Sequence, residues 1–231
     1  MGFPDAHIHP TEPMPRETYP DLGDAELLFG CTAKESEWDR MRGIDDPRVV
    51  RFYGVHPWYA DGWTADAADA LRDLLDSDAG ACVGEIGLDS RRGASNQIGA
   101  FEEQLAIAEE FGRPVNVHCV GSEKVVIDAL SRHRRIPHVI VHAFSNESYA
   151  IPLVRLGCHL SVNPRVLARS DMRVCRLMRS IPGDRLLLES DAPFTPGFSG
   201  MTDFSTRLAS VIGTDADDLM GMALRNARSI L

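Results

Sequence analysis

Residues 81–120 read ACVGEIGLDSRRGASNQIGAFEEQLAIAEEFGRPVNVHCV, and this stretch decides the class of fold. An apolar, β-rich run over Ala81–Leu88 precedes a segment of helical period over Gln97–Glu110, and a second apolar run follows over Pro114–Val120. Strands that alternate with amphipathic helices in this way build βαβ units around a parallel sheet. The stretch therefore predicts an α/β protein.

The same alternation extends along the chain in both directions. The six other expected strands are Gly2–Ile8, Glu26–Ala33, Val49–Val55, His138–Phe144, Cys158–Asn163 and Arg185–Asp191. The six other expected helices are Ala65–Leu75, Ser122–Arg132, Ser148–Leu156, Arg173–Ser180, Phe204–Ile212 and Ala216–Ile230. Eight strands predict a TIM-type (β/α)8 barrel, with an imperfect or shortened βα unit where the segment after Ala33 is only weakly helical. A doubly wound open sheet is the rival architecture, but no GxGxxG or P-loop motif follows any of these runs.

Composition narrows the class of protein. The chain has 231 residues, 44% hydrophobic and 25% charged, as expected of a globular domain, and no linker divides residues 1–231, so one domain is expected. Thirty-four acidic against 24 basic residues leave a charge of −10, which argues against an extended nucleic-acid-binding surface. Five cysteines without a CxxC pair indicate reduced thiols and a cytoplasmic protein. Neither a signal peptide nor a membrane span is expected.

Histidines and carboxylates stand near the ends of the expected strands. His7 and His9 form an HxH pair, and residues i and i+2 of a strand project to the same side. The C-terminal ends of barrel strands meet at the rim where active sites of this fold lie. We therefore expect one cluster at the mouth, made of His7, His9, Glu85, His118, His142 and Asp191.

Four imidazoles and two carboxylates suit one or two divalent metal ions, of which Zn, Mn and Mg are the candidates. A two-metal hydrolytic site needs a carboxylate shared between the ions, and Glu85 is expected to be this bridge. Asp191 is expected to take a proton from the attacking water. Helix capping or pairing with arginine would explain either acid singly, but a buried acid at the end of an apolar run requires a positive partner.

These residues occur in motifs that resemble those of the TatD-like metal-dependent hydrolases of the amidohydrolase superfamily. The motifs are DAHIHP, GVHPWY, VGEIGLD, VHAFS, LLLESDAP and NARSIL, which together span nearly the whole chain. The resemblance implies a single metal-dependent hydrolase barrel, with one metal held by His7, His9, Glu85 and Asp191 and a second by Glu85, His118 and His142. It also makes His56 and Arg92 candidates for substrate contacts, although a plain turn histidine before Pro57 explains His56 equally well.

The chain departs from that family where substrate contacts are expected. His118-Cys119-Val120 lacks the arginine of the usual HxR motif, and the loop after SDAP is short. The leading interpretation is a hydrolase of phosphoester bonds, with a nucleic-acid end or a small phosphorylated compound as substrate and TatD-like deoxyribonuclease activity among the candidates. A metal-dependent amide, ester or lactone hydrolase is the alternative, and a barrel that binds metal or a partner without turnover is a third. Substrate, native metal and oligomeric state stay open.

Overall fold

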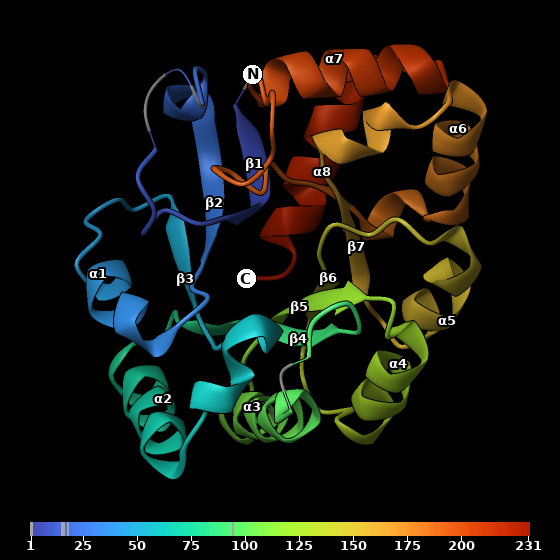
Figure 1. The fold of residues 1–231 in the computed structure, drawn as a ribbon. Coiled ribbons are helices and arrows are strands. Elements are labelled where there is room, and N and C mark those ends of the chain that lie inside the picture. The colour runs from blue at the N-terminus through green and yellow to red at the C-terminus, as the bar shows by residue number, and fades with distance from the viewer. Residues whose placement is uncertain (1, 15–16, 18, 94) are drawn as a thin grey trace.

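Eight parallel strands follow one another around a barrel in the order of the sequence. The computed structural model describes residues 2–14, 17, 19–93 and 95–231. Its strands are β1 Phe3–Ile8, β2 Ala25–Cys31, β3 Val49–Tyr53, β4 Cys82–Asp89, β5 Val115–Val120, β6 Val139–Val141, β7 His159–Val162 and β8 Leu186–Leu188. Figure 1 looks into the end of the barrel at which these strands terminate. The predicted (β/α)8 architecture is confirmed.

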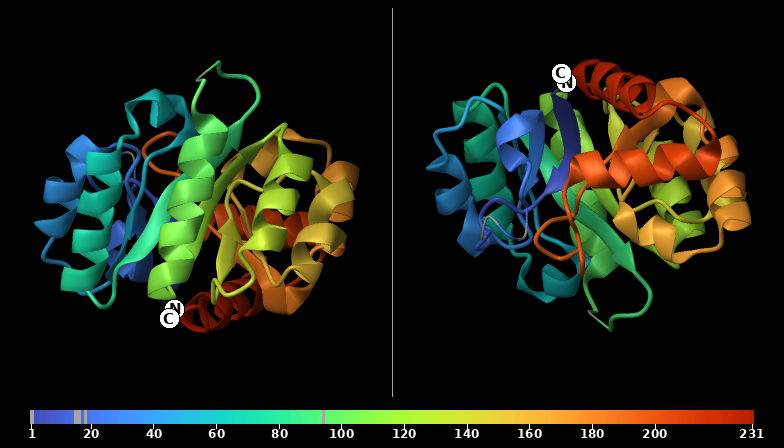
Figure 2. Two further views of the ribbon diagram at one scale, coloured as in Figure 1. Left: turned by 90° about the horizontal axis from the view of Figure 1, so that it is seen from below. Right: turned by 90° about the horizontal axis from the view of Figure 1, so that it is seen from above.

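Helices surround the strands and fill the intervals predicted for them. They are α1 Trp38–Arg42, α2 Ala65–Ser77, α3 Gln97–Phe111, α4 Glu123–Arg132, α5 Ala150–Arg155, α6 Asp171–Ser180, α7 Met201–Ile212 and α8 Ala216–Arg228. The short α1 is the imperfect unit expected after the second strand. Figure 2 shows α8 at the same end of the barrel as both chain termini, opposite the mouth. None of the described helices has the length and apolarity needed to cross a membrane.

The core has two parts, on either side of the strands. Side chains that face the helices form a large outer layer, to which Val83, Val117 and Leu188 belong. A smaller cluster fills the barrel itself and is closed below by Ala227 and Ile230; its strand residues are Ala6, Phe29, Cys31, Phe52, Cys82, Ile140 and Leu187. The barrel is thus packed with apolar side chains towards its N-terminal end, and polar groups collect at the other end.

The barrel closes between its first and last strands through the side chain of Asp5. Its Oδ1 accepts from the backbone N of Ser190 at 2.8 Å, and its Oδ2 accepts from Ser190 Oγ at 2.6 Å and from Tyr19 Oη at 2.8 Å. Backbone bonds continue the seam, from Asp191 N to His7 O and from His9 N to Ala192 O, both at 2.9 Å. This seam brings the two ends of the sequence together at the mouth.

Two strands end three residues before their predicted ends, a larger difference than at the end of any other strand. The expected strands His138–Phe144 and Arg185–Asp191 correspond to β6 Val139–Val141 and β8 Leu186–Leu188. Just beyond each, one residue has left-handed backbone, Ala143 with φ 48° and Asp191 with φ 53°. Such a residue cannot continue a strand, so the chain turns over the mouth at both places.

Gly87 is required where β4 passes close to the backbone of β5. Its φ is 144°, and a Cβ built on it would lie 2.0 Å from the carbonyl oxygen of His118. That oxygen belongs to the backbone of the neighbouring strand and cannot move without disturbing the sheet. The second glycine of GEIGLD is therefore a packing requirement beside the mouth.

Gly87→Ala should destabilise the protein by at least about 1–3 kcal/mol, the usual cost of a strained backbone, with the clash against β5 added to it. Denaturant unfolding monitored by circular dichroism measures this change. Gly23→Ala is the control, because nothing lies within 4 Å of the added Cβ. Equal denaturant midpoints for Gly87→Ala and Gly23→Ala would contradict the clash between a Cβ at Gly87 and β5.

His159 at the start of β7 makes stability depend on pH. Burial, and then the charge of Arg185, lower its pKa to about 4. An unfolded histidine titrates near 6.5, so the neutral ring stabilises the fold above that pH, and this contribution is lost as the pH falls towards 4. In the presence of a chelator, the unfolding free energy should fall more steeply over this interval in the parent than in His159→Gln. Equal slopes of unfolding free energy against pH in the parent and in His159→Gln would show that His159 does not titrate on unfolding.

Candidate metal centre

All six residues expected at the metal centre come together in the mouth of the barrel. His7 lies in β1, Glu85 in β4 and His118 in β5. The other three follow strands: His9 comes after β1, His142 after β6 and Asp191 after β8. They are all buried, and five of them line a cavity of about 510 Å³, the exception being His7, which lies beneath it and is fully buried.

Four donor atoms form a first group. His7 Nε2 and His9 Nε2 are 3.1 Å apart, and they lie 3.4 and 3.5 Å from Glu85 Oε2. Asp191 Oδ1 completes the group at 4.0 Å from His7 Nε2 and 3.7 Å from His9 Nε2. Ligands about 2.1 Å from a tetrahedral zinc ion lie about 3.4 Å from one another, so the separations among His7, His9 and Glu85 fit one ion. Asp191 lies slightly farther from both imidazoles.

A second group shares the same glutamate through its other oxygen. Glu85 Oε1 lies 2.9 Å from His118 Nδ1 and 2.8 Å from His142 Nε2. The two imidazole nitrogens are themselves 3.2 Å apart. One carboxylate thus offers one oxygen to each group, which is the arrangement needed to bridge two cations.

Three polar side chains outside these groups orient the imidazoles. Asn116 Nδ2 donates to the carbonyl of Ala6, so its Oδ1 faces His7 Nδ1 at 3.0 Å as an acceptor. Asp89 Oδ2 lies 3.2 Å from His118 Nε2, and Glu189 Oε1 lies 3.4 Å from His142 Nδ1. An acceptor at the outer nitrogen holds the ring proton there and leaves the inner nitrogen free to bind metal.

His56 differs from these imidazoles, because its outer nitrogen accepts a hydrogen bond and does not donate one. Its Nδ1 accepts from the backbone N of Trp58 at 3.1 Å, so in the neutral ring the proton is on Nε2. That nitrogen points into the centre, 3.3 Å from Glu85 Oε1 and 3.1 Å from His118 Nδ1. His56 is therefore arranged as a hydrogen-bond donor, which suits contact with a substrate oxygen better than metal ligation.

Electrostatics keep Glu85 and His9 in the protonation states that ligation needs. Burial raises the pKa of Glu85, but the surrounding imidazoles, His56 first, lower it by more, so the pKa lies well below its usual range. Burial and the charge of His7 lower the pKa of His9 to about 3. At neutral pH Glu85 is charged and His9 carries a free lone pair. The pKa values of His7 and His142 are instead raised, that of His142 to about 9, because burial lowers them by less than nearby negative groups raise them, so these two rings must lose a proton when metal binds.

The predicted substrate residue Arg92 does not line the cavity. Its guanidinium lies 4.2 Å above the ring of Trp58, which does line it. The neighbouring Arg91 lines the cavity, as does Arg165 from the loop after β7. Arg92 therefore supports the aromatic wall, and its contact with substrate stays a prediction.

The residues that orient the histidines are not among those predicted from the sequence. Asp89 ends GEIGLD and Glu189 stands two residues before Asp191 in LLLESD, so both lie in motifs that were already singled out. Both are acids at the end of an apolar strand, and this feature could have predicted them. Nothing in the sequence marks Asn116 or Arg165, because their partners are distant along the chain.

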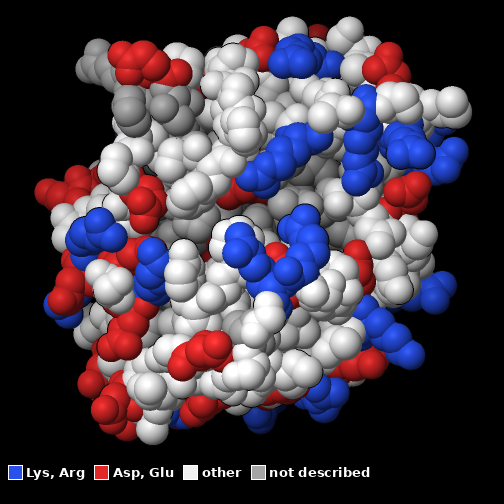
Figure 3. All heavy atoms as spheres, viewed as in Figure 1, with Lys and Arg blue, Asp and Glu red and all other residues white. Residues whose placement is uncertain are grey.

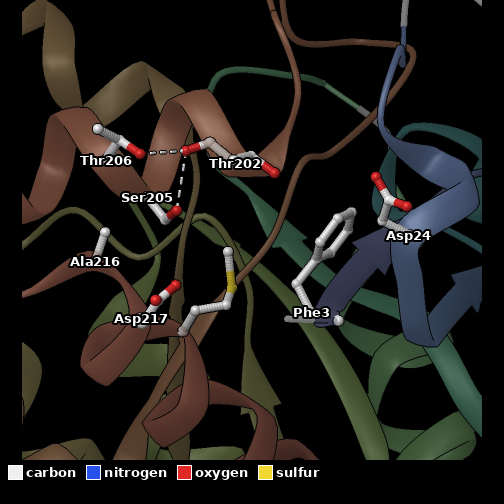
Figure 4. A pocket seen from close by; sticks show the side chains of 9 residues that line it. Phe3, Asp24, Thr202, Ser205, Thr206, Ala216 and Asp217 are labelled. Atoms are coloured by element: carbon white, nitrogen blue, oxygen red, sulfur yellow. Dashed lines mark hydrogen bonds between the residues drawn. The ribbon is translucent and has the colours of Figure 1, made fainter.

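A second cavity, of about 450 Å³, lies at the start of β1 and is drawn in Figure 4. The hydroxyls of Ser205 and Thr206 both donate to the carbonyl of Thr202 within α7. Among the described residues that line it there is no histidine or cysteine. Across the residues that the structure describes, the groups of three His, Asp or Glu side chains close enough to hold one ion all lie at the mouth.

Fold and donor groups together define a (β/α)8 barrel of the class that holds divalent metal at its C-terminal rim. The family model "TatD related DNase" matches residues 5–230. The chain belongs to this family, and the resemblance inferred from the motifs is confirmed.

Similar proteins agree with this assignment. A protein of Edwardsiella piscicida named 3'-5' ssDNA/RNA exonuclease TatD is 37% identical over 61% of this chain and 56% of its own length. One of the same name from Dickeya dadantii is 33% identical over 73% of this chain and 66% of its own length. This chain thus spans less than two thirds of either relative. A TatD homologue of Escherichia coli K12 superposes with a TM-score of 0.87 at 22% identity, covering 99% of this chain and 97% of its own.

Glu85→Gln tests the bridging position. The amide retains the size of the side chain but lacks the charge that holds two cations close together, so at least one ion per chain should be lost with the fold intact. Elemental analysis of the purified protein measures the metal content, and circular dichroism measures whether the fold is intact. The control Glu110→Gln alters an exposed carboxylate that pairs with Arg72, and it should keep the parent stoichiometry. Full metal content in Glu85→Gln would contradict the bridge.

Proposed function

We propose that this chain is a divalent-metal-dependent hydrolase of phosphoester bonds whose substrate is the end of a single-stranded nucleic acid. The observation that carries the proposal is the shared carboxylate, Glu85, with one oxygen in each donor group. Membership of the TatD-related family and the names of the relatives support the choice of bond and substrate. The proposed enzyme uses residues 1–231 as one domain, because His7 and Asp191 come from opposite ends of the chain.

In this proposal His7, His9, Glu85 and Asp191 would hold one ion, and Glu85, His118 and His142 would hold the other. When bound, ions of the Zn, Mn or Mg type would lower the pKa of a water and neutralise charge on the phosphoryl oxygens. The water oxygen adds to phosphorus while the bond to the leaving oxygen breaks. Asp191 accepts the proton of the water and returns it to the leaving oxygen, and His56 donates a hydrogen bond to the phosphoryl group.

The cavity suits a nucleic-acid end. Three aromatic side chains line it and remain 40–52% exposed: Trp58, Tyr59 and Phe194. Exposed aromatic rings stack on bases, and Arg91 and Arg165 beside them complement phosphate. These two arginines offset the missing HxR arginine, which was the main reason to consider amide, ester or lactone substrates. We propose a cytoplasmic location, which the five free cysteines favour.

A substrate screen tests the proposal. Protein loaded in turn with Zn, Mn or Mg should shorten end-labelled single-stranded DNA or RNA and cleave bis(p-nitrophenyl) phosphate. It should be much slower on matched carboxylic esters, amides and lactones. Turnover of the latter substrates with none on phosphodiesters would replace the proposal by the amidohydrolase alternative. Absence of turnover on every bond type, with metal bound, would favour the non-catalytic alternative.

Asp191→Asn separates metal binding from proton transfer. The amide oxygen still coordinates weakly but is not basic, and a positioned general base contributes about 10²–10⁴-fold to rate. The variant should retain more metal than His7→Ala and lose at least about two orders of magnitude in kcat. Asp184→Asn, an exposed acid before β8, is the control. A kcat within a few-fold of the parent would show that Asp191 is not the base.

A further inference from the structure

Arg165 reaches the mouth from a loop that no sequence motif marked. It lies in the short 3-10 helix Pro164–Ala168 after β7, where its backbone N donates to Asn163 Oδ1 at 3.2 Å. Its side chain is 46% exposed and lines the cavity beside Phe194. The guanidinium therefore lies at the boundary between the candidate metal centre and solvent.

The guanidinium holds one oxygen of Asp191. Arg165 Nη1 donates to Asp191 Oδ2 at 2.6 Å, and Nη2 donates to the carbonyl of Phe194 at 2.8 Å. The other oxygen, Oδ1, faces His7 and His9. While this contact persists, Oδ2 is bound to the guanidinium and Oδ1 is directed towards the first donor group.

Charge in the cavity makes Arg165 a group to which phosphate can bind. Among the described residues that line it, Arg91 and Arg165 alone carry a permanent positive charge. Arg91 is 70% exposed and contacts Asp89, whereas Arg165 contacts the carboxylate of the centre itself. Figure 3 shows Lys and Arg side chains near the middle of the face that bears the mouth.

We propose that Arg165 determines specificity for phosphate by exchanging Asp191 Oδ2 for a non-bridging oxygen of the substrate. The exchange anchors the phosphate beside the centre and frees Oδ2 to accept the proton of the water. This inference rests on the proposed phosphoester hydrolysis. It assigns to the loop after β7 the phosphate contact that His118-Cys119-Val120 lacks.

The chemistry of the guanidinium favours such an exchange. Its planar fork matches two oxygens of a phosphate as well as two of a carboxylate. The carboxylate offers it only one oxygen, because Oδ1 belongs to the first donor group. A phosphate that offers two charged oxygens is therefore the stronger partner, and an uncharged ester is not.

Binding of inorganic phosphate to the metal-loaded protein, followed by calorimetry, is the first test. Arg165→Met should weaken binding by about tenfold to a hundredfold, which is the effect of one charge-assisted contact, while metal content stays that of the parent. Arg165→Lys should recover part of the loss because it restores the charge without the fork. Arg169→Met, whose side chain donates to the carbonyl of Ser145 and does not line the cavity, should bind phosphate like the parent.

Turnover of bis(p-nitrophenyl) phosphate is the second measurement. For Arg165→Met, kcat/KM should fall by at least the same factor as phosphate affinity, with partial rescue in Arg165→Lys. Phosphate binding equal to that of the parent in Arg165→Met would overturn the inference. Loss of metal in proportion to loss of phosphate affinity would also overturn it, since Arg165 would then serve only to hold Asp191.

The two measurements separate this inference from the proposed function. Absence of phosphodiester turnover in the parent would contradict the proposed function. The calorimetric comparison of the parent with Arg165→Met and Arg165→Lys would still decide whether Arg165 binds phosphate.

Discussion

Burial of the Glu85 carboxylate is the constraint on which the mouth of the barrel depends. A charge this deep in a protein is costly unless positive groups or a metal surround it. Both oxygens meet imidazole nitrogens, Oε2 from the first donor group and Oε1 from the second. The glutamate therefore fixes the spacing between the two groups, and the strands that carry the histidines converge on it.

The imidazoles of the two donor groups are in turn oriented by buried polar side chains around them. Asn116, Asp89 and Glu189 each face the outer nitrogen of one imidazole, so the inner nitrogen is left for metal. His56 does not follow this pattern, because its outer nitrogen accepts from the backbone N–H of Trp58. The partner of the outer nitrogen thus distinguishes an imidazole arranged to ligate metal from one arranged to donate a hydrogen bond.

Closure of the barrel is the second condition for the site. β1 and β8 are far apart in sequence and are joined by Asp5, which accepts from Ser190 and Tyr19, and by backbone hydrogen bonds just beyond the two strands. The same seam fixes the left-handed backbone of Asp191 through its bond to the carbonyl of His7. A residue held in that conformation points inward over the mouth, where the first donor group and Arg165 share its two oxygens.

The sequence by itself determined the strand count, the places of the longer helices and the six residues at the mouth, because each depends on local periodicity and on position at the end of a strand. Two strands, β6 and β8, were predicted to run three residues too far, since the left-handed turns at Ala143 and Asp191 are stabilised by contacts with other parts of the chain. The tautomers of the histidines and the contact of Arg165 with Asp191 are decided by tertiary structure alone. Each depends on side chains distant along the chain, brought to hydrogen-bonding distance only when the barrel closes.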